Sequence, residues 1–472
     1  MRTAMWNRAT KIKVLVGIFL ALVAVLGLTV WTALRSQEIR EGLRGVLRES
    51  VEVMLPEAEE AKRELEAELE KIKAVGEPMT VEEIIPPEVP DEENAAVVYQ
   101  KAFEKLDLSE EDKDVLGDLL SSMAQPPRGE APTMANIGQI VAKNAAAIAL
   151  LEKAAQCPKC RFPVDWEAGN AMTFPHLAEL RKCARILAAQ AVIRARWGEV
   201  TQSFDTVEVG LSLCEAVRDE PLLISQLVRY TIVPMLLRPL DVVLEEEVVS
   251  TASCRELFDY LAGMEFMQSF VHSLWAERAM SIGTFEHLRQ HPEEGEYITG
   301  EDNPELARIY AGPFGPAILD KDEATYLRLM AEQIAAGMKP YRESHTELVE
   351  IEGRIDQEAR PACVLTATLL PVFTHVAAKR DATITRVGLA QAALTLKAYK
   401  NKKGGYPGSL AQLREVIDWG ELPEDPFSGK EFVYRREGEG FLIYSIGADL
   451  EDDGGKAEQD WKEGDVVWRC AK

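Results

Sequence analysis

One apolar run near the N-terminus limits the kind of protein that this sequence can form. From Val14 to Leu34 the chain has 21 consecutive uncharged residues, VLVGIFLALVAVLGLTVWTAL. A helix of this length crosses the ~30 Å hydrocarbon core of a bilayer, whereas a secretory signal peptide usually has an apolar region of only ~7–15 residues. Trp31 stands where an interfacial anchor is typical. The run therefore predicts an uncleaved transmembrane helix, preceded by a short tail of residues 1–13.

The charged residues bear on orientation and on partners. Basic residues flank the span almost equally, four on each side: Arg2, Arg8, Lys11 and Lys13 before it, and Arg35, Arg40, Arg44 and Arg48 after it. The amino terminus adds a charge to the first side, and large domains translocate largely regardless of charge, so we expect the bulk of the chain outside the cytoplasm.

The net charge of −25 disfavours nucleic acid and anionic membrane surfaces, and it favours cations or basic surfaces as partners.

The next segments predict a stalk, a linker and a helical domain. Residues 35–75 form a charged helical stalk, with Leu65, Leu69 and Ile72 on one apolar stripe that either seeds a coiled coil or lies on a neighbouring domain. The stretch 76–94 is rich in proline and acids, which is typical of an extended linker. From 95 to 360 the apolar positions have mostly helical spacing.

Two parts of that domain are informative. The stretch 176–217 predicts two helices that meet at Trp197-Gly198, similar to one tetratricopeptide unit, but no clean repeat of ~34 residues follows. We therefore expect a helical array, either irregular or TPR-like. The apolar stretch 221–244 contains Gln226, Arg229, Arg238 and two interior prolines, which favours a buried core helix over a second span.

Catalytic motifs give no named reaction. The Cys157-Pro-Lys-Cys160 sequence lacks a second pair for zinc, and a local loop disulfide is favoured over free thiols. His287 and His291 lack the glutamate of a metalloprotease motif and are interpreted as solvated. There is no GxSxG sequence, P-loop or Rossmann fingerprint, so we predict that the protein is not an enzyme.

After Gly404 the apolar period changes to two, in EFVYR, FLIYSI and DVVWR, which predicts a small antiparallel sheet packed on the preceding helix. An acidic loop joins the last two strands. Its spacing is close to a calcium loop of the EF-hand type, in which alternate oxygens point inward and glycine allows a sharp turn. Two features depart from the EF-hand type: glutamate occupies the third position of the loop, and strands rather than helices flank it. Counted from the first acid, the candidate calcium ligands are Asp449, Glu451, Asp453, the Gly455 carbonyl and Asp460.

The C-terminal stretch also resembles a family. The stretch 389–413 begins as a helix and contains the motif GGYPG. It is followed along the chain by LPEDPFSG, FVYR, LIYSIGAD and GDVVW. These motifs, in this order, resemble the C-terminal half of the major pseudopilin of type II secretion. The resemblance implies a structural calcium in the β–β loop, with Asp449 and Asp465 as ligands together with nearby carbonyls. Leu450 replaces a common glycine, and the N-terminal processing site of a pseudopilin is not found before Val14. The whole chain also resembles uncharacterised membrane-anchored bacterial proteins that carry this module.

These observations predict a mainly α chain: a transmembrane helix, a helical array and, over 361–472, a small α+β module with an antiparallel sheet. The expected protein is single-pass in the bacterial inner membrane, mostly extracytoplasmic, and works by binding another protein. The alternatives are an enzyme with an unrecognised site in the helical domain and a divergent minor pseudopilin of a secretion system.

Overall fold

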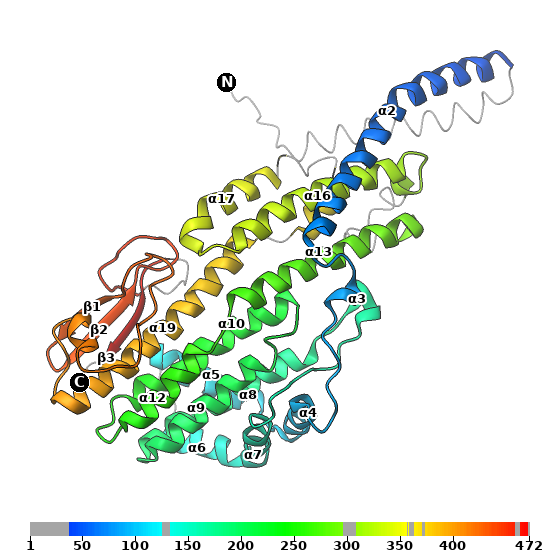
Figure 1. Ribbon diagram of the computed structural model, residues 1–472. Coiled ribbons are helices and arrows are strands. Elements are labelled where there is room, and N and C mark those ends of the chain that lie inside the picture. Colours follow the sequence, from blue (N-terminus) through cyan, green and yellow to red (C-terminus); the bar gives the residue numbers. More distant parts are fainter. Residues whose placement is uncertain are drawn as a thin grey trace, which may run out of the picture. The chain divides into compact units, whose positions relative to one another are not determined.

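The computed structural model describes residues 37–124, 133–295, 308–355, 357, 363–370, 373–457 and 463–470. The chain is mainly helical and ends in a three-stranded antiparallel sheet, as the sequence predicts (Figure 1). It divides into two compact units. The first contains residues up to 77, 284–330 and 352–371, and the second contains 78–283, 331–351 and 372–472.

The predicted transmembrane helix, Val14–Leu34, lies outside the described ranges. Within those ranges, no single helix combines the length and the hydropathy that a membrane crossing requires. One pair, α6 (Met134–Lys143) and α7 (Ala145–Ala154), meets both criteria when taken together, but its two helices are bent by 68°.

The first unit is built on the helical stalk, α2 (Gln37–Val75). Leu65 and Ile72 of its predicted apolar stripe are buried. A stripe that is covered in this way is an amphipathic helix packed on its neighbours. Asp322 organises a second part of this unit, because its carboxylate accepts hydrogen bonds from the backbone N–H groups of Leu365 and Thr366 at the start of α18. The unit includes the end of α13 (Met267–Gln290), the start of α16 (Gly315–Gly337) and α18 (Val364–Leu369).

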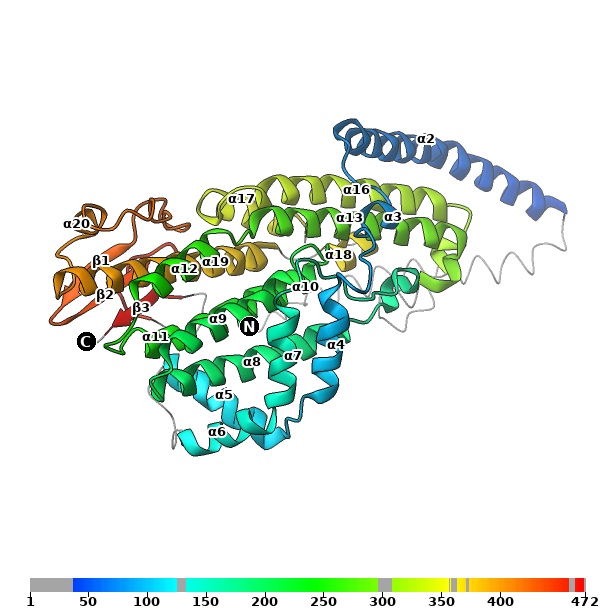
Figure 2. The same ribbon diagram turned by 60° about the horizontal axis from the view of Figure 1, so that its bottom comes forward.

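The second unit contains most of the remaining helices (Figures 1 and 2). In chain order they are α3 (Val81–Ile84), α4 (Ala95–Lys105), α5 (Glu110–Ala124), α6, α7, η1 (Trp166–Ala171), α8 (Pro175–Arg196), α9 (Val200–Glu215), α10 (Leu223–Leu237), α11 (Pro239–Val243), α12 (Thr251–Ala262), α17 (Tyr341–Arg354), α19 (Phe373–Lys403) and α20 (Leu410–Arg414).

The predicted helix–turn–helix is confirmed. α8 ends at Arg196 and α9 begins at Val200, and Gly198 between them has a φ of 81°, a conformation that glycine adopts without steric cost. The two helices pack along each other. Gly210 allows α10 to approach α9 closely, because a Cβ there would overlap the Leu236 side chain. The stretch 221–244 forms the buried helices α10 and α11, which agrees with the core-helix interpretation.

The proline-rich stretch 76–94, which the sequence predicts as an extended linker, contains one short helix. In this helix, α3, the Glu83 carboxylate accepts hydrogen bonds from the N–H groups of Met79 and Thr80. Ile84 is buried against Ala276 and Ala279 of α13. The capping contacts of Glu83 and the burial of Ile84 therefore hold α3 in place, although the composition of the segment is polar and rich in proline.

The C-terminal sheet packs on α19 (Figure 1). Its strands, β1 (Val433–Glu437), β2 (Gly440–Ser445) and β3 (Val466–Cys470), are antiparallel in the order β1-β2-β3. Gly388 lets the sheet side approach the helix, because a Cβ there would lie 2.8 Å from the Phe432 ring. α19 also packs on α10 and α12. Residues 372–472 belong to the same compact unit as 78–283 and 331–351, and residues 352–371 belong to the first unit.

Candidate functional site

The two acids that the family resemblance selects lie at the two ends of the β2–β3 loop. Asp449 follows β2, and its carboxylate accepts hydrogen bonds from the N–H groups of Glu451 (3.1 Å) and Gly464 (2.6 Å). The second contact spans the loop, because Gly464 directly precedes Asp465 and β3. Asp449 thus ties the start of the loop to its end.

Asp465 organises the other side of the loop. It is 5% exposed, and its carboxylate accepts hydrogen bonds from the N–H groups of Gly455 (2.6 Å), Lys456 (3.2 Å) and Asp453 (3.4 Å). Burial raises the pKa of this carboxyl above its ordinary value, and the three N–H donors counteract only part of that rise. A buried carboxylate whose hydrogen-bond donors are backbone N–H groups keeps its negative charge, and its oxygens are ligands that a hard cation such as calcium prefers.

The structure describes the twelve-residue calcium count only in part. Glu451 and Asp453 are exposed, and Gly455 lies under the Leu442 and Tyr444 side chains. Asp460 lies outside the described residues. Over the part of the loop that the structure describes, no three His, Cys, Asp or Glu side chains converge enough to hold a metal.

The structure also shows acids that the sequence analysis did not select. Asp452 accepts hydrogen bonds from the Tyr444 hydroxyl (3.0 Å) and the Gly454 N–H (2.9 Å). Asp425, 1% exposed, accepts a hydrogen bond from the Ser445 hydroxyl (2.6 Å) and fixes the Asp-Pro-Phe-Ser turn against the end of β2. The Asp-Pro-aromatic motif was visible in the sequence, but its contact with Ser445 requires the folded sheet.

A second candidate site is a cleft of about 610 Å³ in the helical array of the second unit. It is lined by the prolines of the 76–94 stretch, the first turn of α4, the loop that contains Cys157 and Cys160, and the ends of α7, α9 and α12. This volume lies within the range of about 300–1,000 Å³ that is typical of small-ligand sites. The cleft is therefore large enough to receive a ligand or a short peptide segment.

One wall of the cleft is fixed by Asn94. Its side-chain amide donates to the Arg161 carbonyl (3.0 Å), and its side-chain oxygen accepts from the N–H groups of Arg161 (2.9 Å) and Ala96 (3.0 Å). The Ala95 N–H donates to the Lys159 carbonyl (2.9 Å). One side chain therefore caps α4 and clamps the 157–161 loop, so this wall is rigid before any ligand arrives.

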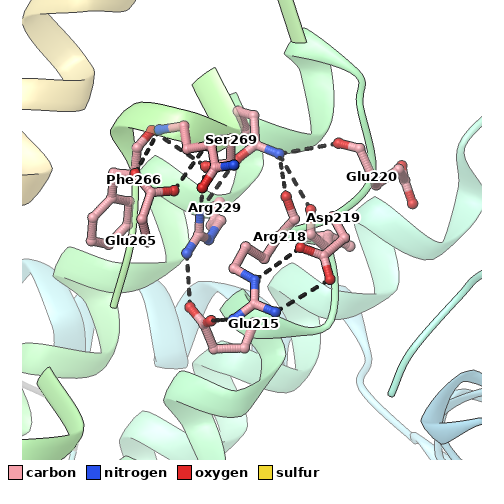
Figure 3. Close-up of polar contacts among 11 residues, drawn as sticks. Glu215, Arg218, Asp219, Glu220, Arg229, Glu265, Phe266 and Ser269 are labelled. Atoms are coloured by element: carbon pink, nitrogen blue, oxygen red, sulfur yellow. Dashed lines mark hydrogen bonds and ion pairs between the residues drawn. The ribbon is translucent and has the colours of Figure 1, made fainter. Parts of the chain in front are cut away.

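A chain of alternating charges reaches the cleft lining at Glu215, Arg218 and Asp219 (Figure 3). The fully buried Arg229 donates to Glu215 (2.8 Å) and Ser269 (2.9 Å), and its guanidinium lies 4.6 Å from the centroid of the Phe266 ring. Arg218 donates to the other Glu215 oxygen (3.1 Å) and to Asp219 (2.9 Å). The hydrogen bond to Asp219 raises the pKa of Arg218. Each carboxylate in this chain is paired with a guanidinium.

The thiols of the cleft differ from the favoured sequence interpretation. Cys157 and Cys160 are free and half-buried, and the disulfide that we expected between them is not formed. Burial raises the pKa of the Cys160 thiol, so it is protonated at neutral pH. The Asn94 clamp supplies the restraint on this loop that a disulfide was expected to provide.

The histidine pair lies elsewhere, in the first unit. His287 is half-exposed and contacts Glu294 at 2.8 Å, and His291 is similarly exposed. This agrees with the interpretation of both side chains as solvated.

The chain matches no protein-family model, no curated protein and no solved structure. The functional argument therefore depends on the two candidate sites themselves.

Proposed function

We propose that this protein is a single-span protein of the bacterial inner membrane that binds another protein in the cleft of its helical array, outside the cytoplasm. The observation that carries the binding role is the preformed cleft, whose wall is held by Asn94 and whose floor is held by the Arg229–Glu215 chain. Preorganised walls favour binding because little conformational entropy is lost when a partner docks. The membrane anchor and the orientation rest on the Val14–Leu34 run and on the flanking charges.

We also propose that the C-terminal module is similar to the type II secretion pseudopilin and that calcium stabilises it. Asp449 and Asp465 would hold the ion, together with carbonyl oxygens of the loop. These carboxylates fit the role because their hydrogen-bond donors are backbone amides, which leave the negative charge uncompensated. The bound ion would supply that compensation and join the two ends of the loop.

Catalysis in the same cleft is the second candidate function, because Glu215, Asp219, Asp259 and two thiols line it. The pairing of these groups favours binding instead. Glu215 and Asp219 are held by Arg218, Asp259 is held by Arg255 at 2.7 Å, and burial keeps Cys160 protonated. A general base or nucleophile needs a pKa near the working pH and an unengaged reactive atom.

Site-specific photo-crosslinking in native membranes tests the binding role. A benzophenone amino acid in place of Met264, which lines the cleft, should form a covalent adduct with a protein. The same replacement at Lys101, an exposed position on α4 outside the cleft lining, should form none. Equal labelling from both positions, or no adduct from position 264, would contradict protein binding in the cleft.

A further inference from the structure

A cluster of three charged side chains lies outside the cleft, on α10, α11 and α19 of the second unit. Arg238 joins α10 to α11 with helical backbone angles (φ −57°, ψ −40°), so Arg238 and Asp241, three positions apart, lie on one helix face. α10 packs on α19, which carries Arg386 (Figure 1). The charges of all three groups act on one another, and each side chain is partly exposed. The cluster is therefore compact and reaches solvent.

Arg386 differs from its neighbour on the same helix in its hydrogen bonding. Arg380 is fully buried and is held by Asp381 at 2.7 Å. No hydrogen bond or ion pair joins the Arg386 guanidinium to any residue that the structure describes, and over the same ranges Asp241 accepts no hydrogen bond. A partly buried charge in this situation is costly unless a ligand completes it.

The electrostatics of the cluster leave positive charge in excess. Burial lowers the pKa of Arg386 to about 10, repulsion by Arg238 acts in the same direction, and attraction by Asp241 opposes the fall. Burial raises the pKa of Asp241 to about 7, although both arginines attract its charged form. Arg238 donates through Nη1 to the Leu120 carbonyl (2.5 Å), a neutral acceptor that does not cancel its charge. Two cations therefore face one weakened acid.

We propose that this cluster binds a small oxyanion, a phosphate or carboxylate group, between the guanidinium groups of Arg238 and Arg386. A guanidinium presents its N–H donors in a planar fork that matches the oxygens of either group. An anion at this place would supply acceptors to Arg386 and offset the repulsion between the two cations. The net charge of −25 opposes a polyanion, so the ligand should be small. The inference is separate from the proposed protein binding in the cleft.

Thermal unfolding of the full-length protein tests this proposal. Sodium phosphate and sodium acetate at about 10 mM are compared with sodium chloride at equal ionic strength, in a buffer that contains neither oxyanion group. We expect the oxyanions to raise the melting temperature above its value in chloride. A larger rise with phosphate assigns a phosphate ligand, and a larger rise with acetate assigns a carboxylate ligand. Equal melting in all three salts overturns the proposal.

Replacement of Arg386 distinguishes a ligand site from a structural charge. Arg386→Met should lose the rise that the oxyanions cause, and it should melt in chloride at the same temperature as the unchanged protein, because the charge that it removes has no direct partner among the described residues. Lys403→Met removes an exposed lysine at the end of the same helix and should keep the full rise. A rise that persists in Arg386→Met, or a much lower melting temperature of this variant in chloride, overturns the proposal.

Asp241 gives a prediction of opposite sign, which decides the question if Arg386→Met does not fold. Asp241→Asn removes the negative charge of the cluster, so it should tighten phosphate binding by about three- to tenfold. Isothermal titration at about pH 8 measures this change, because Asp241 is ionised above its pKa of about 7. Glu247→Gln, at an exposed acid beyond the end of α11, should leave the affinity unchanged. Unchanged or weaker binding in Asp241→Asn, or equal tightening in both variants, overturns the site.

Discussion

The acidic loop between β2 and β3 and the cleft of the helical array both concentrate carboxylates, yet the two regions give them different hydrogen-bond donors. In the loop, Asp449 and Asp465 accept from backbone N–H groups. In the cleft, Glu215 and Asp219 accept from guanidinium groups. Backbone dipoles stabilise a carboxylate without cancelling its charge, whereas a guanidinium cancels it. The loop therefore retains a demand for a cation, and the floor of the cleft meets that demand internally.

The two kinds of hydrogen-bond donor also make the stability of the two regions depend on different groups. Pairing by buried arginine makes the cleft floor depend strongly on every member of the chain, because removal of one partner leaves a charge without compensation. Pairing by backbone amides leaves the carboxylates of the loop charged. The stability of the loop should therefore depend on its acids and on the cations in solution, because a bound cation can balance that charge.

Replacement of Arg229 should have the largest effect. Arg229→Leu removes the buried cation, takes the donor from Ser269 and leaves Glu215 with Arg218 alone, so the free energy of unfolding should fall by about 3–5 kcal/mol. Thermal unfolding of the full chain measures this. The matched control is Arg435→Leu, which breaks an exposed pair with Glu437 and should cost less than about 1 kcal/mol. Equal stability of the two variants would show that the cleft floor is not held by its charges.

Replacement of Asp465 should come second. Asp465→Ala removes the acceptor of three backbone N–H groups, and we expect a loss of about 1.5–3 kcal/mol, confined to the C-terminal module. Amide hydrogen exchange of residues 453–456 should accelerate, while exchange in the 157–161 loop stays unchanged. Glu451→Gln, an exposed acid of the same loop, should change stability by less than about 0.5 kcal/mol. Unaltered exchange at Gly455 in Asp465→Ala would refute the organising role of this carboxylate.

Calcium should have a smaller effect, limited to the loop. Extracellular calcium modules bind at about 10⁻⁴–10⁻³ M, so millimolar calcium should stabilise the module by about 0.6–1.4 kcal/mol. Asp449→Ala should remove most of this gain. Loss of the gain in Asp465→Asn supports the geometry implied by the family resemblance, and loss in Asp460→Ala supports the twelve-residue count. Identical melting in chelator and in millimolar calcium would show that the loop is a solvated acidic turn.

Leu450 tests the backbone of the loop with the smallest expected effect. Leu450 has a φ of 63°, the one positive value among non-glycine residues that the structure describes. A leucine in this left-handed region costs about 1–2 kcal/mol, and glycine avoids that cost but loses some burial and chain stiffness. We expect Leu450→Gly to raise stability by up to about 1 kcal/mol in a melting experiment. A clear loss would mean that the side-chain packing of Leu450 outweighs its backbone strain.

The sequence predicted the elements of the C-terminal module well, because their signals are local. The change of apolar period after Gly404 located all three strands, and Trp197-Gly198 located the break between α8 and α9. Glycine positions and apolar periods act over a few residues, so they can be read without a fold. The anchor, the orientation and the calcium site remain predictions from sequence.

The cleft shows where sequence reasoning ends. The sequence contains Tyr99, Cys160 and Tyr260 as isolated residues, and no spacing rule connects positions so far apart. Only the packing of α4, α7, α9 and α12 brings them to one cleft, because the long-range contacts of a helical array depend on which faces meet. The same reason explains the 76–94 stretch: its composition indicates a linker, but the apolar surface of α13 buries Ile84.

The helical class, the C-terminal strands and the concentration of acids at 449–465 follow from propensity, period and charge, which are local properties of the chain. Which acids acquire guanidinium partners and which acquire backbone amides is set only by folding. That choice depends on the distance between atoms that are remote in sequence, such as Arg229 and Ser269, and on the loss of solvent around them. Electrostatic energies depend on both distance and burial, and neither quantity exists until the chain has folded.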